Sequence, residues 1–213
     1  MDTEMLIDAL ARDVAPVSPH SVRWRLLAGI LGGGIITLLL VAAMLGFRHD
    51  LGLAMHGFAF WMKWSYTISL GIGAVALVSR LARPEPVRLV RHWPVALPFL
   101  ILAAISISEM MHTPPGDWLS MWLGHSWGVC PWIILALSAP IFVGLLWSFR
   151  RLAPTRLRSA GAASGLAAGA WSAAVYCLHC PEVSAFFVLT WYSLGIFLAA
   201  GVGAVIGPKI LRW

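Results

Sequence analysis

Six long apolar stretches account for most of this chain and constrain its fold more than any other feature. They cover residues 24–47, 60–79, 93–110, 127–149, 159–178 and 183–206. A helix that crosses a bilayer needs about 20 mostly apolar residues, because each residue advances the helix by about 1.5 Å. The stretches are continuous rather than alternating, which argues against the strands of a membrane barrel. The sequence therefore predicts an all-α, polytopic integral membrane protein built as a six-helix bundle.

The composition agrees with a chain that is dissolved in lipid. Hydrophobic residues make up 60% of the 213 positions and charged residues only 11%, whereas about 25% of the residues in a soluble domain are charged. The connections between the apolar stretches are short, so we expect one transmembrane domain over residues 23–213 and a cytoplasmic tail over residues 1–22. This composition excludes a free cytosolic enzyme, and we expect no catalytic residues.

Successive connections between the predicted spans lie on alternate sides of the membrane, and basic residues are divided unevenly between these two sides. Of the 15 Lys and Arg residues, 13 lie on the side of the two termini, and only Arg48 and Lys63 lie on the opposite side. Because Lys and Arg are enriched in cytoplasmic connections, both termini are expected in the cytoplasm. Lys63 and Glu109 lie near span ends on the outer side, where we expect their charged groups to snorkel to the interface. Every basic cluster borders a span, so no direct contact with nucleic acid is expected.

Two ladders of small residues predict close packing between helices. Gly161, Gly165 and Gly169 recur at every fourth position of the fifth stretch, and Gly195 and Gly203 belong to a similar ladder in the sixth. Small residues let two backbones approach closely in lipid, where burial of apolar side chains supplies little driving force. We expect the two ladders to face each other or a neighbouring helix.

Three cysteines fall near the outer ends of the predicted spans. Cys130 is near the start of the fourth stretch, and Cys177 and Cys180 bracket the end of the fifth. They are compatible with inert buried thiols, with a redox pair that joins Cys130 or Cys177 to Cys180, or with a soft-metal site. The ligands of the metal site would be Cys130 and Cys180, with the imidazole of His179.

The tail carries the pattern of an amphipathic helix. Leu6, Ile7, Leu10 and Val14 fall within an arc of about 100° on a helical wheel, and charged residues lie opposite. A helix of about 12 residues is marginally stable alone, and it gains order when its apolar face lies in a partner's groove. The net charge of the tail is −3, so a basic protein partner is expected rather than an anionic lipid surface.

Several strings along the whole chain resemble the NrsF family, also called DUF1109. They are LIDALARDVAPV at 6–17, WGVC at 127–130, RRLAP at 150–154, the small ladder at 160–170, HCPE at 179–182, WY at 191–192 and LRW at 211–213. The resemblance implies a multi-pass protein of the bacterial inner membrane. Such a protein acts as an anti-sigma factor: it holds an extracytoplasmic-function (ECF) sigma factor inactive and releases it under stress.

The resemblance also implies roles for particular residues. The two sensory thiols of the family correspond to Cys130 and Cys180, and Cys177 is an additional cysteine. The expected partners are the sigma factor, bound through Leu6, Ile7, Leu10 and Val14 of the tail, and the lipid bilayer. No cofactor is expected apart from transient binding of a heavy metal at the thiols. Oxidation or metal capture would shift the fourth span against the fifth and lower the affinity for the sigma factor.

Two other functions are compatible with a small helical membrane bundle. A membrane thiol:quinone oxidoreductase usually has at least two redox pairs, which three cysteines cannot form. A small-solute permease is disfavoured because no predicted span carries an acidic residue or a histidine near its middle.

Overall fold

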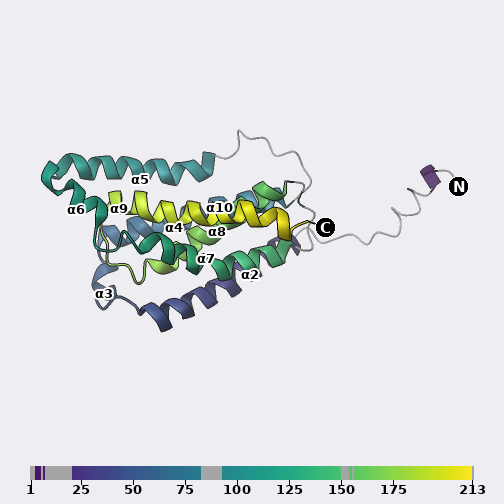
Figure 1. Ribbon diagram of the computed structural model, residues 1–213, viewed down its shortest axis with the longest axis horizontal. Helices are drawn as coiled ribbons and strands as arrows, with labels where there is room; N and C mark the ends of the chain where they lie inside the picture. Colours follow the sequence, from purple (N-terminus) through teal and green to yellow (C-terminus); the bar gives the residue numbers. More distant parts are fainter. Residues whose placement is uncertain are drawn as a thin grey trace.

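The computed structural model describes residues 3–5, 7, 21–82, 93–149, 154 and 156–212, and the structural statements that follow concern these residues. Six long helices run along a common direction (Figure 1). They are α2 (Ser21–Leu40), α4 (Phe58–Leu81), α5 (Trp93–His112), α7 (Cys130–Phe149), α8 (Leu157–Tyr176) and α10 (Ser193–Ile210). The described residues contain no β-strand, so the all-α prediction is confirmed.

Short segments connect or extend the long helices. They are the π-helical turns η1 (Val41–Leu45) and η4 (Val188–Tyr192), the 3₁₀ turn η3 (Pro115–Asp117) and the short helices α3 (Leu51–Ala54), α6 (Trp118–Leu123) and α9 (Ala185–Phe187). The turn η1 continues α2, whereas α9 and η4 lead directly into α10. Each of the six predicted stretches therefore coincides with one long helical segment, with differences of a few residues at the ends.

Five helical segments are long and apolar enough to cross a membrane, namely Arg23–Leu45, Phe58–Leu81, Val95–His112, Cys130–Phe149 and Ala185–Ile210. The remaining predicted stretch, the fifth, corresponds to α8, which has 20 residues and is rich in Gly, Ala and Ser. Helix α8 contacts α10, α4, α7 and α2, and most of its side chains are buried. A central helix has little lipid-facing surface, so small residues replace the large apolar side chains of the outer helices.

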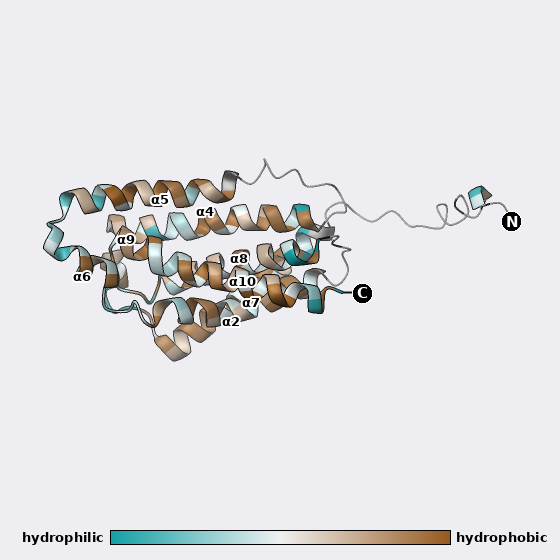
Figure 2. Ribbon diagram, turned by 45° about the horizontal axis from the view of Figure 1, so that its top comes forward, coloured by the Kyte–Doolittle hydropathy of each residue, from teal (hydrophilic) through white to brown (hydrophobic). Residues whose placement is uncertain are grey.

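The outer helices present large apolar side chains away from the bundle. Leu31 and Ile35 of α2, Leu100 of α5, Val143 of α7 and Val205 of α10 are all exposed. Figure 2 shows that hydrophobic residues recur along most of the length of these helices. Exposed apolar surface on this scale is typical of a membrane-facing protein and unlike a soluble monomer.

The closest helix contact joins α8 and α10 through the predicted ladders. A Cβ atom at Gly161 would meet the backbone of Gly203, and one at Gly165 would meet the carbonyl oxygen of Ala199. Gly169 lies against Ile196. Gly195 faces α7 instead, where a Cβ atom would lie 2.9 Å from the carbonyl oxygen of Pro131. The two backbones of α8 and α10 therefore touch directly, as the small residues permit.

A second close contact, between α2 and α7, was not predicted. A Cβ atom at Gly144 would meet the carbonyl oxygen of Gly29, and one at Gly33 would lie 2.8 Å from the backbone nitrogen of Ile141. Gly32 and Gly34 have open space around them. Only one residue of the triple-glycine string at 32–34 therefore serves close packing, and the string alone does not reveal which.

The long helices place two chemically different ends on the bundle. The thiol end comprises η1, α3, α6, α9 and the three cysteines, and the basic end comprises the start of α2 and the end of α10 (Figure 1). The described basic residues of the basic end are Arg23, Arg25, Arg80, Arg156, Arg158, Lys209 and Arg212. The thiol end has Arg48 and Lys63. The charge asymmetry predicted along the sequence therefore becomes an asymmetry between the two ends of one bundle.

The α8–α10 contact leads to a prediction about stability. We expect Gly165→Ala to lower the unfolding free energy in detergent by about 1–3 kcal/mol, because overpacking a close contact forces the backbones apart. Gly201→Ala on α10 is the matched control, since a Cβ atom there meets nothing within 4 Å. Thermal unfolding of both variants measures the difference. An unfolding temperature of Gly165→Ala equal to that of the control would contradict the direct backbone contact.

Candidate functional site

The three cysteines gather at the thiol end of the bundle. Cys130 is the first residue of α7, Cys177 directly follows α8, and Cys180 lies in the connection from α8 to α9. All three are free thiols and none has exposed surface. The three cysteines predicted near the outer span ends therefore form one compact cluster, and their thiols face the interior of the protein rather than its surface.

A tight turn after α8 directs Cys180 back toward the bundle. The backbone N–H groups of His179 and Cys180 both donate to the carbonyl oxygen of Tyr176, at 2.9 and 3.0 Å. Pro181 follows and has no N–H group with which to continue the helix. The turn therefore ends at Cys180 and places its side chain beside the start of α7.

The thiols of Cys130 and Cys180 lie close enough to each other for each to influence the ionisation of the other. Cys177 lies close by, but its thiol contacts Thr67 of α4 and Tyr192 of η4. The sequence left open whether Cys130 or Cys177 is the partner of Cys180. The geometry favours Cys130.

The surroundings of Cys180 favour its ionised form. The hydrogen bond from Cys130 lowers the pKa of the Cys180 thiol to about 6, from an ordinary value of about 8.5. Burial acts in the opposite direction, whereas the positive charge of Lys63 and a contact with Tyr192 lower the pKa further. A thiolate is the nucleophilic form of cysteine, so Cys180 is the thiol of this cluster that is best prepared to react.

Lys63 of α4 is fully buried beside the cysteines. Its ammonium group donates hydrogen bonds to the carbonyl oxygens of Cys180 at 3.1 Å and Glu182 at 2.6 Å. The prediction that Lys63 snorkels to the interface is wrong, because the side chain turns inward and finds these two acceptors. Burying a charge without hydrogen-bond partners is costly, and the two carbonyl groups offset part of the cost of burying the Lys63 ammonium group.

Two tyrosines form an aromatic wall around the thiols. The rings of Tyr176 and Tyr192 lie 5.8 Å apart, and the Tyr176 hydroxyl contacts Cys130. The Tyr192 hydroxyl is buried and has no hydrogen-bond partner of good geometry within the described residues. Tyr192 closes the π-helical turn η4, and such turns occur often at functional sites.

The His179 ring contacts groups other than the thiols. Its Nδ1 atom lies 2.9 Å from the carbonyl oxygen of Gly46, and its ring packs at 5.7 Å from that of Tyr176. Across the described ranges, no group of three or more His, Cys, Asp or Glu side chains is arranged to hold a metal ion. Metal binding by Cys130, Cys180 and His179 stays a prediction.

Two carboxylates tie the loops of the thiol end together. The Glu182 carboxylate accepts hydrogen bonds from the backbone N–H groups of His125 at 2.7 Å and Ser126 at 3.2 Å. Glu109 accepts from the Ser184 hydroxyl at 3.0 Å and from the N–H group of Phe186 at 3.1 Å. Glu109 is half-buried and its carboxylate binds the start of α9, and its snorkelling to the interface stays a prediction. These contacts fix the segment that follows Cys180.

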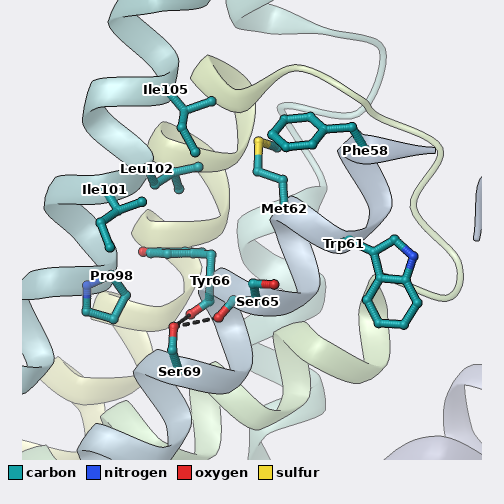
Figure 3. A pocket seen from close by; sticks show the side chains of 10 residues that line it. All are labelled: Phe58, Trp61, Met62, Ser65, Tyr66, Ser69, Pro98, Ile101, Leu102 and Ile105. Carbon is teal, nitrogen blue, oxygen red and sulfur yellow. Dashed lines mark hydrogen bonds between the residues drawn. The ribbon is translucent and has the colours of Figure 1, made fainter.

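A cavity of about 280 Å³ lies between α4 and α5, on a different face of α4 from Lys63. Figure 3 shows its lining, which includes Phe58, Met62 and Ile105, with Ser69 donating to backbone carbonyls of its own helix. None of its lining residues is a Cys, His or carboxylate. Its lining is mostly apolar and does not include Lys63 or any of the three cysteines.

The predicted sigma-factor-binding residues fall mostly outside the described part of the chain. Leu6, Leu10 and Val14 are not among the described residues. Ile7 is helical, and its side chain is 56% exposed. A residue that binds a partner must be exposed in this way. The binding role of the tail stays a prediction.

Sequence reasoning missed the residues that surround the thiols. Lys63, Thr67, Tyr176 and Tyr192 come from three different segments and meet at the cysteines only through helix packing. One signal was present: Lys63 is a lone lysine within a long apolar run. An ionisable residue inside a span is by default a candidate functional residue.

Comparison with known proteins covers the whole chain. The family model of NrsF, described as negative regulator of sigma F, matches residues 10–213. The chain is 41% identical over its full length to the "Probable anti-sigma-F factor NrsF" of Azospira oryzae, and 40% identical to the "Anti-sigma-F factor NrsF" of Caulobacter vibrioides, each of which is also covered completely. No solved structure matches the chain. The resemblance seen in the sequence is thus confirmed, and the chain belongs to the NrsF family.

Proposed function

We propose that this chain is a bacterial inner-membrane anti-sigma factor that binds an ECF sigma factor through its N-terminal tail and releases it when Cys130 and Cys180 are oxidised. The observation that most supports this proposal is the proximity of these two thiols. The chain also matches anti-sigma-F factors along its full length. The role is regulatory rather than catalytic.

The proposed topology has six spans with the basic end in the cytoplasm. Five helices meet the requirements of length and apolarity, and α8 is enclosed among them. The start of α2 and the end of α10 share the basic end. Lys and Arg favour the cytoplasmic side of a membrane. The thiol end then faces the periplasm, which is an oxidising compartment in bacteria.

The proposed signal passes along the helices from the thiol end to the basic end. Cys130 begins α7 and Cys180 follows α8, so a disulfide bond between them constrains two helices that reach the opposite end. A disulfide typically changes the stability of a folded arrangement by about 2–4 kcal/mol. Shifting a two-state equilibrium from mostly bound to mostly free needs an energy of about that size.

The proposed binding surface is the apolar face of the tail, and Leu10 lies at its centre. We expect Leu10→Asp to weaken retention of the sigma factor by about 30-fold or more, because loss of a central apolar anchor costs about 2 kcal/mol. Co-purification of the sigma factor with the detergent-solubilised full chain measures the effect.

Ala9→Asp is the matched control for this variant, since it adds the same charge outside the apolar arc. It should retain the sigma factor at close to the wild-type level. Equal retention by Leu10→Asp and the wild type, at equal amounts in the membrane, would remove the tail from the binding surface.

The proposed switch depends on two particular thiols. We expect a peroxide to release the sigma factor from membranes that contain the wild-type chain, and to leave it bound in the Cys130→Ser, Cys180→Ser double variant, because the disulfide cannot form. Mass spectrometry without reductant should find the Cys130–Cys180 crosslink in the wild type. Cys177→Ser should still respond, since its thiol contacts Thr67 and Tyr192 instead. Undiminished release from the double variant would contradict the thiol switch.

A further inference from the structure

We propose that Lys63 is the positioning residue of the thiol pair: it holds Cys180 against Cys130, and its buried positive charge stabilises the reduced pair relative to the disulfide. This inference rests on the proposed role of the two thiols as a redox pair. It adds the reason why the pair stays reduced until an oxidant arrives, and it identifies the residue responsible.

The geometric part of the inference follows from two hydrogen bonds. The Lys63 ammonium donates to the carbonyl oxygens of Cys180 and Glu182, at 3.1 and 2.6 Å. These carbonyl groups flank Pro181, which cannot donate a backbone hydrogen bond of its own. One side chain of α4 therefore anchors the segment that follows α8, and this anchor sets the position of Cys180 relative to α7.

The electrostatic part follows from the burial of Lys63. The side chain has no exposed surface, and within the described residues no carboxylate lies close enough to form an ion pair with it. A buried ammonium group needs a compensating negative charge or strong acceptors. The sulfur of Cys180, as a thiolate, is the anion that the cluster offers, and the lowered pKa of Cys180 agrees with this assignment.

Cys180 is surrounded by titratable and charged groups from each of the elements packed against it. The titratable and charged groups that face it are Lys63, Arg48, Cys130, Tyr176, Cys177, Tyr192 and Glu182. Arg48 is already paired with Asp50, at 2.6 Å. The buried hydroxyl of Tyr192 faces Cys180 and acts as a donor that favours the thiolate. Lys63 is therefore the cation whose charge is left for Cys180.

Oxidation removes the anion that faces Lys63. The Cys180 thiolate attacks one oxygen of a hydroperoxide: the S–O bond forms, the O–O bond breaks, and the other oxygen takes up one proton and leaves as water or an alcohol, so that Cys180 becomes a sulfenic acid. The Cys130 thiol then attacks this sulfur, the S–S bond forms, and water departs with the Cys130 proton. The product has no negative charge beside Lys63, so the buried ammonium keeps only its two carbonyl acceptors. The disulfide form is correspondingly less stable than it would be without Lys63.

The test measures the equilibrium between the dithiol and the disulfide in the full chain, purified in detergent in a Cys177→Ser background. Buffers of reduced and oxidised dithiothreitol set the potential, since oxidised dithiothreitol takes up the two electrons and two protons that the thiols lose. Acid quenching and thiol alkylation, followed by mass spectrometry, give the oxidised fraction. The variants are Lys63→Met, which removes the charge, Lys63→Arg, which keeps it, and Lys209→Met, which removes the other lysine of the chain.

We expect Lys63→Met to favour the disulfide about tenfold more than the parent, a potential more negative by about 30 mV. Lys63→Arg should restore the parental value, and Lys209→Met should leave it unchanged. A Lys63→Met potential equal to or more positive than that of the parent overturns the inference. If Lys63→Met does not fold, the ultraviolet absorbance of the thiolate provides the second test. This absorbance should be present at neutral pH in the parent and absent from Cys180→Ser. Its absence from the parent overturns the inference as well.

The same samples separate this inference from the proposed function. A shifted potential in Lys63→Met, together with an oxidised chain that still retains its sigma factor, supports the role of Lys63 and contradicts the thiol switch. Release on oxidation with no shift of the potential supports the switch and contradicts the role of Lys63.

Discussion

The direct backbone contact between α8 and α10 is the constraint on which the rest of the bundle depends. Lipid is as apolar as the side chains that face it, so burial of large side chains does little to hold helices together. Close approach at Gly161 and Gly165 supplies the packing instead. It also places α8 at the centre of the bundle, in contact with α4, α7 and α10. The position of Cys180 follows, because Cys180 is attached to the end of this central helix.

The thiol cluster then brings together residues of three helices at one end of the bundle. Cys130 belongs to α7, Cys180 follows α8, and Lys63 of α4 donates a hydrogen bond to the carbonyl oxygen of Cys180. A chemical change at one sulfur therefore acts on three helices together. Because these helices run the length of the bundle, a small displacement at the thiol end has a mechanical route to the basic end. This arrangement suits the regulatory role of a protein family whose members are named for control of a sigma factor.

Much of the fold is predictable from the sequence, and physical reasons separate what is predictable from what is not. Continuous apolar runs identify the long helices, because the thickness of a bilayer requires a minimum length. The ladder of Gly161, Gly165 and Gly169 identifies a contact face, because every fourth residue lies on one side of a helix. The partner of Gly33 in α7 carries no such pattern, since Ile141 is an ordinary apolar residue of its helix.

The candidate site was predictable only in part, because its residues meet through tertiary packing. Spacing along the chain places Cys177 and Cys180 near each other, yet the turn after α8 points Cys180 toward Cys130. Lys63 was expected at the interface, and instead it lies inside, where two carbonyl groups accept its hydrogen bonds. Orientation of a side chain around a helix near the membrane boundary depends on such acceptors, and a single sequence does not reveal them.

The central claim is that one molecule carries its thiols and its tail on opposite sides of a membrane. The most direct measurement labels single-cysteine variants in intact and in opened cells with a membrane-impermeant maleimide. One variant carries its cysteine in place of Ala9 in the tail, and another in place of His56 in the exposed connection beside α3. The account predicts that the residue 56 variant is labelled in intact cells and that the residue 9 variant is labelled only after the cells are opened. Labelling of both positions under the same condition would contradict it.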